Sequence, residues 1–189
     1  MFFERKSQAA MEFLMTYGWA IMVVLLALGA LAYFGVLNPQ NILPEKCTFP
    51  TGFHCQDYLV NANSSEVALR FTNGKGEGMI ILKIEVEDTE GNFDNCTLDF
   101  TTEGACGNVT EADEYCGDGS SGTGGYNDKV GWYLSSSQIG AATVPCDDIT
   151  AYEGKAKANI HLTYYKATSD STYNHTETGE LLARAYTTS

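Results

Sequence analysis

Six cysteines are the side chains of this 189-residue sequence best suited to covalent chemistry. None belongs to a C-x-x-C pair, which argues against a zinc ribbon or a thioredoxin-like redox site. An even number of cysteines placed after an apolar segment favours disulfides formed in an oxidising compartment, and the alternative is a set of small buried thiols. We predict three disulfides between sequence neighbours: Cys47–Cys55, Cys96–Cys106 and Cys116–Cys146.

The other potentially reactive side chains form no catalytic motif. His54, His161 and His175 fit no H-E-x-x-H, nucleophile-elbow or triad pattern. The glycine-rich stretch 117–125 lacks the G-K-[ST] ending of a phosphate loop, and the acidic residues at 113–128 and 147–148 lack EF-hand spacing. The sequence therefore predicts a protein that is not an enzyme and that uses no cofactor and no metal.

Four N-x-S/T triplets offer a different chemistry, the attachment of glycans to an asparagine amide. They begin at Asn63, Asn95, Asn108 and Asn174, and all follow the apolar segment. A single triplet is common by chance, but four in a domain expected to be exported indicate surface N-glycosylation. Asn95 is the weakest candidate, because the middle residue of its triplet is a cysteine expected to form a disulfide.

The overall charge excludes one class of partner. The chain has 11 Lys and Arg against 24 Asp and Glu, which gives a net charge of −13. Nucleic-acid binding needs a basic face, so we expect no nucleic-acid partner. Copies of such a chain repel one another at long range, so any assembly must be held by something other than surface charge.

A long apolar stretch at residues 8–37 must position everything that follows. Its one charged residue is Glu12, and the run is long enough to span a bilayer as a helix. Arg5 and Lys6 precede it, so we expect the N-terminus to stay in the cytoplasm and the later residues to lie outside the cell. No small-x-small cleavage site follows the run, so we expect the helix to be retained in the mature protein.

These features divide the chain into four predicted segments. Asn38-Pro39 predicts the end of the helix, because the residue before a proline avoids helical geometry. We predict a short N-terminal segment at 1–7, a transmembrane helix at 8–38, a linker at 39–46 and an extracellular, disulfide-bonded, β-rich head at 47–189.

Apolar alternation in the head predicts strands. Val67 to Phe71 and the set Ile80, Leu82, Ile84 and Val86 read as half-buried strands, and the glycine-rich residues 73–78 between them predict a hairpin. Runs at 158–165 and 181–186 predict a second hairpin around the polar turn 169–179. The residues between Cys96 and Cys146 read as a long loop region. The predicted fold class is α+β, a long apolar helix followed by an antiparallel, immunoglobulin-like β-sandwich.

The residues before the helix carry a resemblance. Lys6-Ser7-Gln8, then Ala9-Ala10-Met11-Glu12-Phe13 and an apolar run, resembles the class III signal peptide of archaeal type IV pilins. In that family a prepilin peptidase cuts before the helix, leaving Gln at the first mature position and Glu at the fifth. Gln8 and Glu12 match this spacing, so the resemblance implies that residues 1–7 are a leader peptide removed by cleavage between Ser7 and Gln8, and that 8–38 is an assembly helix. A free amine on Gln8 could then pair with Glu12 of its own or a neighbouring subunit and set the register of assembly.

The resemblance implies an extracellular type IV pilus-like filament used for adhesion. Copies of the chain would form a helical homopolymer, with helices in the core and glycosylated heads outside. Its partners during biogenesis would be the peptidase, a cytoplasmic assembly ATPase and a membrane platform protein, and the precursor would reside in the plasma membrane. The alternatives are a minor pilin, a membrane-anchored cell-surface binding protein and an archaellum-type subunit.

Overall fold

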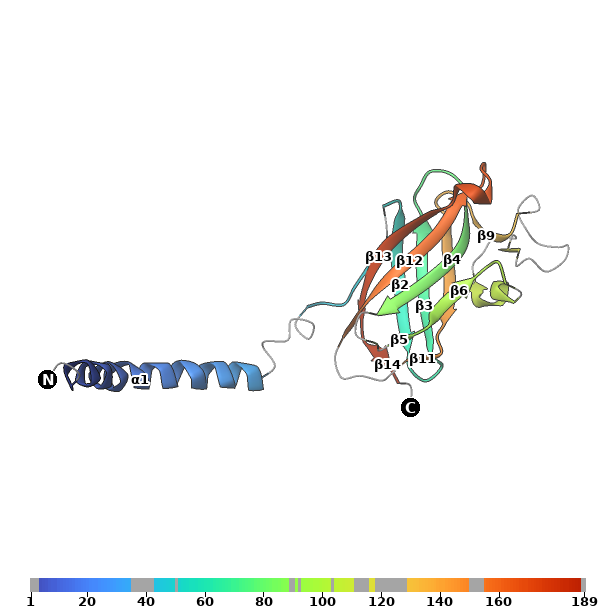
Figure 1. Cartoon of the computed structure of the whole chain (residues 1–189). Coiled ribbons are helices and arrows are strands. Elements are labelled where there is room, and N and C mark those ends of the chain that lie inside the picture. Colours follow the sequence, from blue (N-terminus) through green and yellow to red (C-terminus); the bar gives the residue numbers. More distant parts are fainter. Residues whose placement is uncertain are drawn as a thin grey trace. The chain divides into compact units, whose positions relative to one another are not determined.

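The chain folds into two compact units, Met1–Leu43 and Pro44–Ser189 (Figure 1). The computed structural model describes residues 4–34, 43–49, 51–88, 91, 93–102, 104–110, 116–117, 129–149 and 155–187. The first unit holds one helix and the second holds the strands, so the coarse fold class is α+β, as predicted.

The first unit is built on α1 (Glu4–Tyr33). Its 30 residues contain no proline and are rich in Leu, Ala and Met, which favour helices. The helix begins before Gln8, so the predicted leader and the predicted assembly helix share one continuous element. The predicted helix end at Asn38 and the first residues of the predicted linker lie outside the described residues.

The larger of two curled sheets in the second unit has seven strands (Figure 1). Six follow one another in the order β1 (Lys46–Thr48), β13 (His175–Ala183), β12 (Ala156–Lys166), β4 (Met79–Asp88), β9 (Gly131–Leu134) and β8 (Cys116–Gly117). The seventh, β6 (Cys96–Asp99), pairs with residues 83–86 of β4, further along that strand than the residues 79–81 that pair with β9. Every pair in this sheet is antiparallel.

The second sheet has five strands. Their order is β14 (Ala185–Tyr186), β2 (Phe53–Asn61), β3 (Glu66–Asn73), β10 (Ile139–Pro145) and β7 (Val109–Thr110). Only the short β14–β2 pair is parallel. A two-stranded ribbon joins β5 (Phe93–Asp94) to β11 (Asp148–Ile149), and two short 3₁₀ turns are η1 (Ala105–Asn108) and η3 (Ser171–Tyr173).

Both sheets contribute to one hydrophobic core. The predicted inward faces of β3 (Val67, Leu69 and Phe71) and of β12 (Ala158, Ile160 and Leu162) are buried, which confirms both alternations. Aromatic rings fill the centre, where Phe71 and Trp132 meet edge to face with ring centroids 5.7 Å apart. The head therefore buries its own apolar surface without help from the helix.

The second predicted hairpin is confirmed, although β13 begins at His175 inside the predicted turn and residues 185–186 pair with β2 instead, and the first predicted hairpin is wrong. Strands β12 and β13 pair from Ala156↔Ala183 to Tyr164↔His175. Strand β3, however, pairs with β2 and β10, whereas β4 pairs with β12, β6 and β9. The glycine-rich residues after Asn73 thus carry the chain from one sheet to the other.

The predicted inward face of β4 is wrong in part, because the strand contains a β-bulge. Thr163 faces Lys83 and Tyr164 faces Ile81, so Leu82 is an extra residue in β4. The bulge reverses the alternation. Ile84 and Val86 enter the main core as predicted, whereas Ile80 joins a separate small cluster, against which Leu82 packs.

Three disulfides are present, as predicted, but two of the predicted pairings are wrong. Cys47–Cys55 is confirmed, whereas the other bonds are Cys96–Cys146 and Cys106–Cys116. The β5–β11 ribbon explains the difference, because it brings the chain next to Cys96 beside the chain next to Cys146. The predicted long loop between these cysteines is also wrong in part, since it contains β9 and β10, and Trp132 of β9 is fully buried.

Candidate functional site

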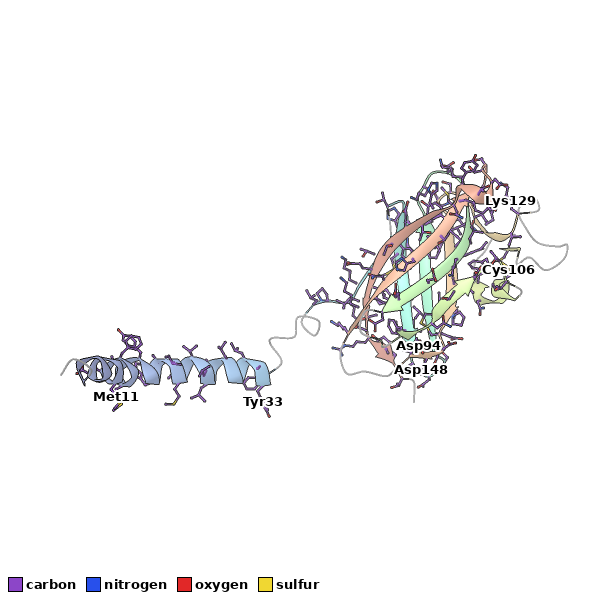
Figure 2. All side chains as sticks on the ribbon, in the orientation of Figure 1. Met11, Tyr33, Asp94, Cys106, Lys129 and Asp148 are labelled. Carbon is purple, nitrogen blue, oxygen red and sulfur yellow. A yellow bond between two sulfur atoms is a disulfide. The ribbon has the colours of Figure 1, made fainter. Side chains whose placement is uncertain are left out.

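The surface of α1 is the largest exposed apolar feature among the described residues. Side chains stand out from the helix between Met11 and Tyr33 (Figure 2). Among the described residues, the segment Met15–Tyr33 of α1 is the one helical stretch long and apolar enough to cross a membrane. Its mean hydropathy is 2.0, and its most apolar 18 residues are not buried inside the protein. Leaving a large apolar side chain in water costs about 1.5–3 kcal/mol, so covering this surface with lipid or with other apolar side chains would be favourable.

The N-terminal turns of α1 hold the residues of the predicted processing and assembly site. Ser7, Gln8 and Glu12 all lie within the helix, and the four-residue spacing places Gln8 and Glu12 on the same face. The Glu12 side chain is exposed, and its backbone carbonyl accepts a hydrogen bond of 2.8 Å from the Thr16 hydroxyl. No ion pair of the Glu12 carboxylate is found with any side chain that the structure describes.

The four glycosylation candidates differ in accessibility. Asn63, in the turn between β2 and β3, and Asn174, between η3 and β13, are exposed, whereas Asn108 in η1 is half-buried. Asn95 is exposed, but its amide donates to Asp147 at 2.9 Å, and the next residue is tied to Cys146. Asn63 and Asn174 thus present the most accessible amides, and the three disulfides of the same unit suit an extracellular protein.

One ionised cluster was missed by the sequence reasoning. The Lys75 ammonium lies 2.9 Å from the Glu177 carboxylate, and the Tyr164 hydroxyl donates to the same carboxylate at 2.6 Å. The ammonium also lies 5.4 Å from the centroid of the Phe53 ring and 5.1 Å from that of the Tyr164 ring. The cluster therefore joins the β3–β4 connection to the β12–β13 hairpin.

The electrostatics of this cluster favour its charged form. Burial by itself raises the pKa of the Glu177 carboxyl, but the Tyr164 hydrogen bond and the Lys75 ammonium outweigh it and hold the pKa below its ordinary value. Burial lowers the pKa of Lys75, but bonding to Tyr164 and Glu177 raises it further than burial lowers it. Burial and the neighbouring carboxylate raise the pKa of the Tyr164 hydroxyl. This arrangement suits a structural clamp.

The histidines and acidic residues show no metal-binding arrangement within the described part of the chain, where no group of three or more His, Cys, Asp or Glu side chains could hold an ion. His161 Nδ1 bonds the Thr178 hydroxyl at 3.0 Å, and its Nε2 lies 3.5 Å from Glu87. The acidic residues Asp113, Glu114, Asp118 and Asp128 lie outside the described residues.

The outer faces of the two sheets differ in charge. Ion pairs cover the seven-stranded sheet, among them Lys157–Glu180 at 3.1 Å and Lys83–Glu85 at 2.7 Å. The five-stranded sheet has a shallow hollow of about 170 Å³, whose lining includes Leu59, Ala68 and Ala141. Leu59 is 47% exposed there, beside the charged Asp57 and Arg70 that also line the hollow.

No protein-family model matches this chain, and a comparison with curated proteins finds no similar sequence.

Proposed function

We propose that this protein is a structural subunit of an extracellular type IV pilus-like filament that serves in adhesion. The observation that carries the proposal is the exposed apolar helix α1, preceded by the Ser7-Gln8 junction and carrying Glu12 on the face of Gln8. An apolar helix of this length can reside in a bilayer before assembly and in a bundle of helices afterwards. A soluble head with a complete core can then stand outside that bundle.

The energetics favour a filament that is slow to form and hard to dissolve. Lipid is as apolar as leucine, so moving α1 from a membrane into a helix bundle gains little from the hydrophobic effect. Cohesion must come from packing, from contacts between heads and from Glu12 paired with the new amine of Gln8. Extraction from the membrane then needs a cytoplasmic ATPase and a platform protein, and the leader needs a prepilin peptidase.

The proposal assigns different tasks to the two sheet faces of an immunoglobulin-like sandwich head. The seven-stranded face, with its exposed ion pairs, suits water and glycans. The five-stranded face, with Leu59, Ala68 and Ala141, suits contact with the head of a second copy. Small side chains allow close approach there without bringing many charges of one sign together.

The N-terminal residue of the protein in filaments sheared from cells tests this function directly. We expect mass spectrometry to find Gln8 at the mature N-terminus. Ser7→Phe should block cleavage and leave a chain starting at Met1 in the membrane fraction, whereas the matched variant Ser7→Ala should be processed as wild type. A wild-type chain that keeps Met1 and stays in membranes would refute the filament and favour an anchored cell-surface binding protein.

A minor subunit is the second candidate, because the three disulfides give the head a rigid frame on which a ligand-binding surface could be displayed. Quantitative mass spectrometry of the same filaments separates the two roles. A major subunit should be the most abundant polypeptide in the filament. A minor subunit should also start at Gln8 but be greatly outnumbered by another pilin.

A further inference from the structure

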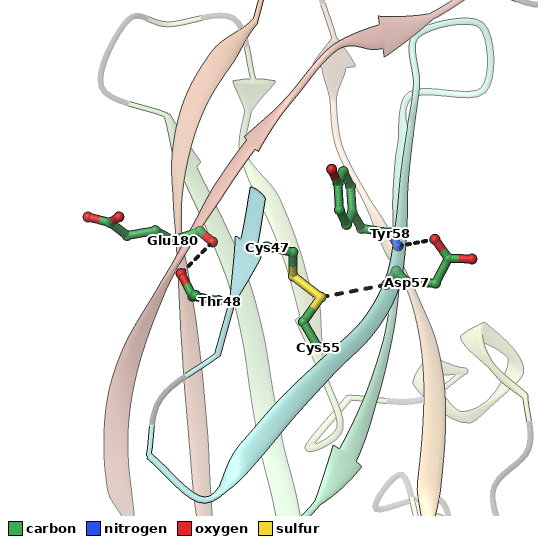
Figure 3. Close-up of a disulfide and its surroundings, with 6 residues drawn as sticks. All are labelled: Cys47, Thr48, Cys55, Asp57, Tyr58 and Glu180. Atoms are coloured by element: carbon green, nitrogen blue, oxygen red, sulfur yellow. Dashed lines mark hydrogen bonds between the residues drawn. A yellow bond between two sulfur atoms is a disulfide. The ribbon is translucent and has the colours of Figure 1, made fainter. Parts of the chain in front are cut away.

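Strand β1 is the first element of the head that any pull from the helix would reach. It has three residues and pairs with one strand, β13, through Lys46↔Leu182, Cys47↔Leu181 and Thr48↔Glu180. The Thr48 hydroxyl adds a hydrogen bond of 3.3 Å to the Glu180 carbonyl (Figure 3). A strand this short, pulled from one end, loses its pairs one after another, so its hydrogen bonds resist peeling weakly.

The ion pairs around β1 add little resistance. Lys46 lies 3.9 Å from Glu180, and both side chains are at least half exposed. Arg184 lies 3.9 Å from Glu45 on the residue just before the strand. Exposed pairs of this kind typically contribute about 0–1 kcal/mol each. The strand pairs and ion pairs of β1 therefore offer little resistance to tension, and the next noncovalent hold is Phe49, whose ring stacks on Phe71 with centroids 4.8 Å apart.

A covalent bond leaves β1 at its centre and crosses to the other sheet. Cys47 is the middle residue of β1, and it is bonded to Cys55 of β2 with a Cα–Cα distance of 6.0 Å (Figure 3). Strand β2 is much better held than β1, because it pairs with β3 from Phe53↔Asn73 to Asn61↔Glu66. Its Phe53 and Val60 side chains are buried in the core.

We propose that the Cys47–Cys55 disulfide is a mechanical latch that carries tension from the helix past β1 and directly into β2 and the core. The inference rests on the proposed function to this extent: α1 must be held in a filament or a membrane while the head is pulled. Tension can then release the chain only as far as Cys47. Beyond that point it must shear β2 from β3, which requires many pairs and buried side chains to yield together.

Force spectroscopy on the full chain tests the latch. The purified, oxidised protein in detergent micelles is tethered through handles at both termini and stretched. The variant Cys47→Ala/Cys55→Ala removes the latch. The matched control is Cys106→Ala/Cys116→Ala, because that bond lies within the loop closed by Cys96–Cys146 and so outside the path of force.

On the N-terminal side of the head, we expect the wild type to release no residues beyond Cys47 before the main unfolding event. The latch variant should show an additional first event at lower force, as β1 and the following residues peel away. Its total extension should grow by about 21 Å, because eight residues span about 27 Å when extended and the intact bond already spans 6.0 Å between the two Cα atoms. The control should match the wild type in both force and length.

A second variant keeps the test decisive if the latch variant folds poorly. Thr48→Pro retains the disulfide but disrupts the pairing of β1, because proline cannot donate to a strand ladder. A latch predicts that its main unfolding force equals that of the wild type. A lower main force, or an early event in the wild-type chain, would overturn the proposal. Neither result depends on filament formation, so a failure of the latch is distinct from a failure of the proposed function.

Discussion

The residues that hold the head together electrostatically come from distant parts of the chain. Lys75 and Glu177 are 102 positions apart, yet their charged groups meet beside the rings of Phe53 and Tyr164. The tyrosine hydroxyl and the ammonium both bond the carboxylate, so each charge has at least one partner. Removing one member leaves the other groups partly buried without that partner. The resulting loss in the free energy of unfolding is larger than the net stabilisation that the intact pair contributes.

Glu177 gives the head a defined response to acid. Its folded-state pKa is lowered, so the stability it contributes is fully present above the unfolded pKa and is lost as the pH falls through the folded pKa. Glu177→Gln should lower the free energy of unfolding at neutral pH by about 1–2 kcal/mol and flatten the acid side of the profile of melting temperature against pH. Glu66→Gln, outside the cluster, should leave that profile unchanged. If the melting temperature of Glu177→Gln falls as steeply with decreasing pH as that of the wild type, other carboxyl groups are responsible for the acid sensitivity.

Glu12 is the residue whose loss should affect assembly without affecting the head. It is the one acidic side chain in the apolar run of α1, and its proposed partner is the Gln8 amine. Glu12→Ala should reduce the amount of subunit recovered in sheared filaments by at least about tenfold, equivalent to about 1.4 kcal/mol. Circular dichroism of the head and processing at Gln8 should remain as in the wild type. Unreduced filament yield in Glu12→Ala would exclude the proposed pairing.

At the scale of elements, the connection between β3 and β4 determines how the two sheets are joined. Asn73, the last residue of β3, is fully buried, and its amide donates to the carbonyls of Glu77, Leu134 and Ser135 at 2.8–3.1 Å. These acceptors belong to the β3–β4 connection and to the end of β9. One side chain thus fastens the crossing between sheets to the β9–β10 turn.

Replacing Asn73 should loosen that crossing. Asn73→Ala leaves three carbonyls without this donor and the Lys75 amide without its 3.0 Å acceptor, so we expect a loss of about 2–4 kcal/mol in the free energy of unfolding. Urea denaturation followed by tryptophan fluorescence measures it, since the buried Trp132 lies in β9, whose Leu134 carbonyl accepts from Asn73. Asn61→Ala, in the more open β2–β3 turn, is the matched control. A loss below about 1 kcal/mol at position 73 would show that the crossing is held by other contacts.

Sequence reasoning succeeded where the signal was local. Alternation in β3 and β12 predicted their buried faces, because a half-buried strand repeats every two residues. It failed where distant segments decide: a glycine-rich connection fits a hairpin and a crossover equally well, and the bulge at Leu82 depends on the neighbouring β12. The Gln8–Glu12 spacing could be found from sequence for the same reason, whereas the Lys75–Glu177 cluster and the Cys96–Cys146 bond required the fold.

At the scale of the whole molecule, the two units have opposite surface requirements. The head buries a core of its own and presents charged and other polar side chains, whereas α1 exposes apolar side chains along its length. The net charge of −13 makes copies repel, so in the proposed filament the attraction between copies would act at short range, through the helices and through contacts between heads. In that proposal, repulsion at long range with attraction at short range favours ordered growth over aggregation in solution.

This balance predicts how salt changes the lateral association of filaments. The Debye length shrinks from about 30 Å at 0.01 M to about 8 Å at 0.15 M salt, so screening should weaken the repulsion between heads and leave the apolar contacts intact. We expect bundling, measured by light scattering and electron microscopy, to increase over this range. Two variants at the exposed Gln56 provide the matched test: Gln56→Glu makes each subunit one charge more negative and should shift the onset of bundling to higher salt, and Gln56→Lys makes it one charge less negative and should shift the onset to lower salt. Bundles that dissolve as salt is added would instead show that ion pairs between heads hold the filaments together.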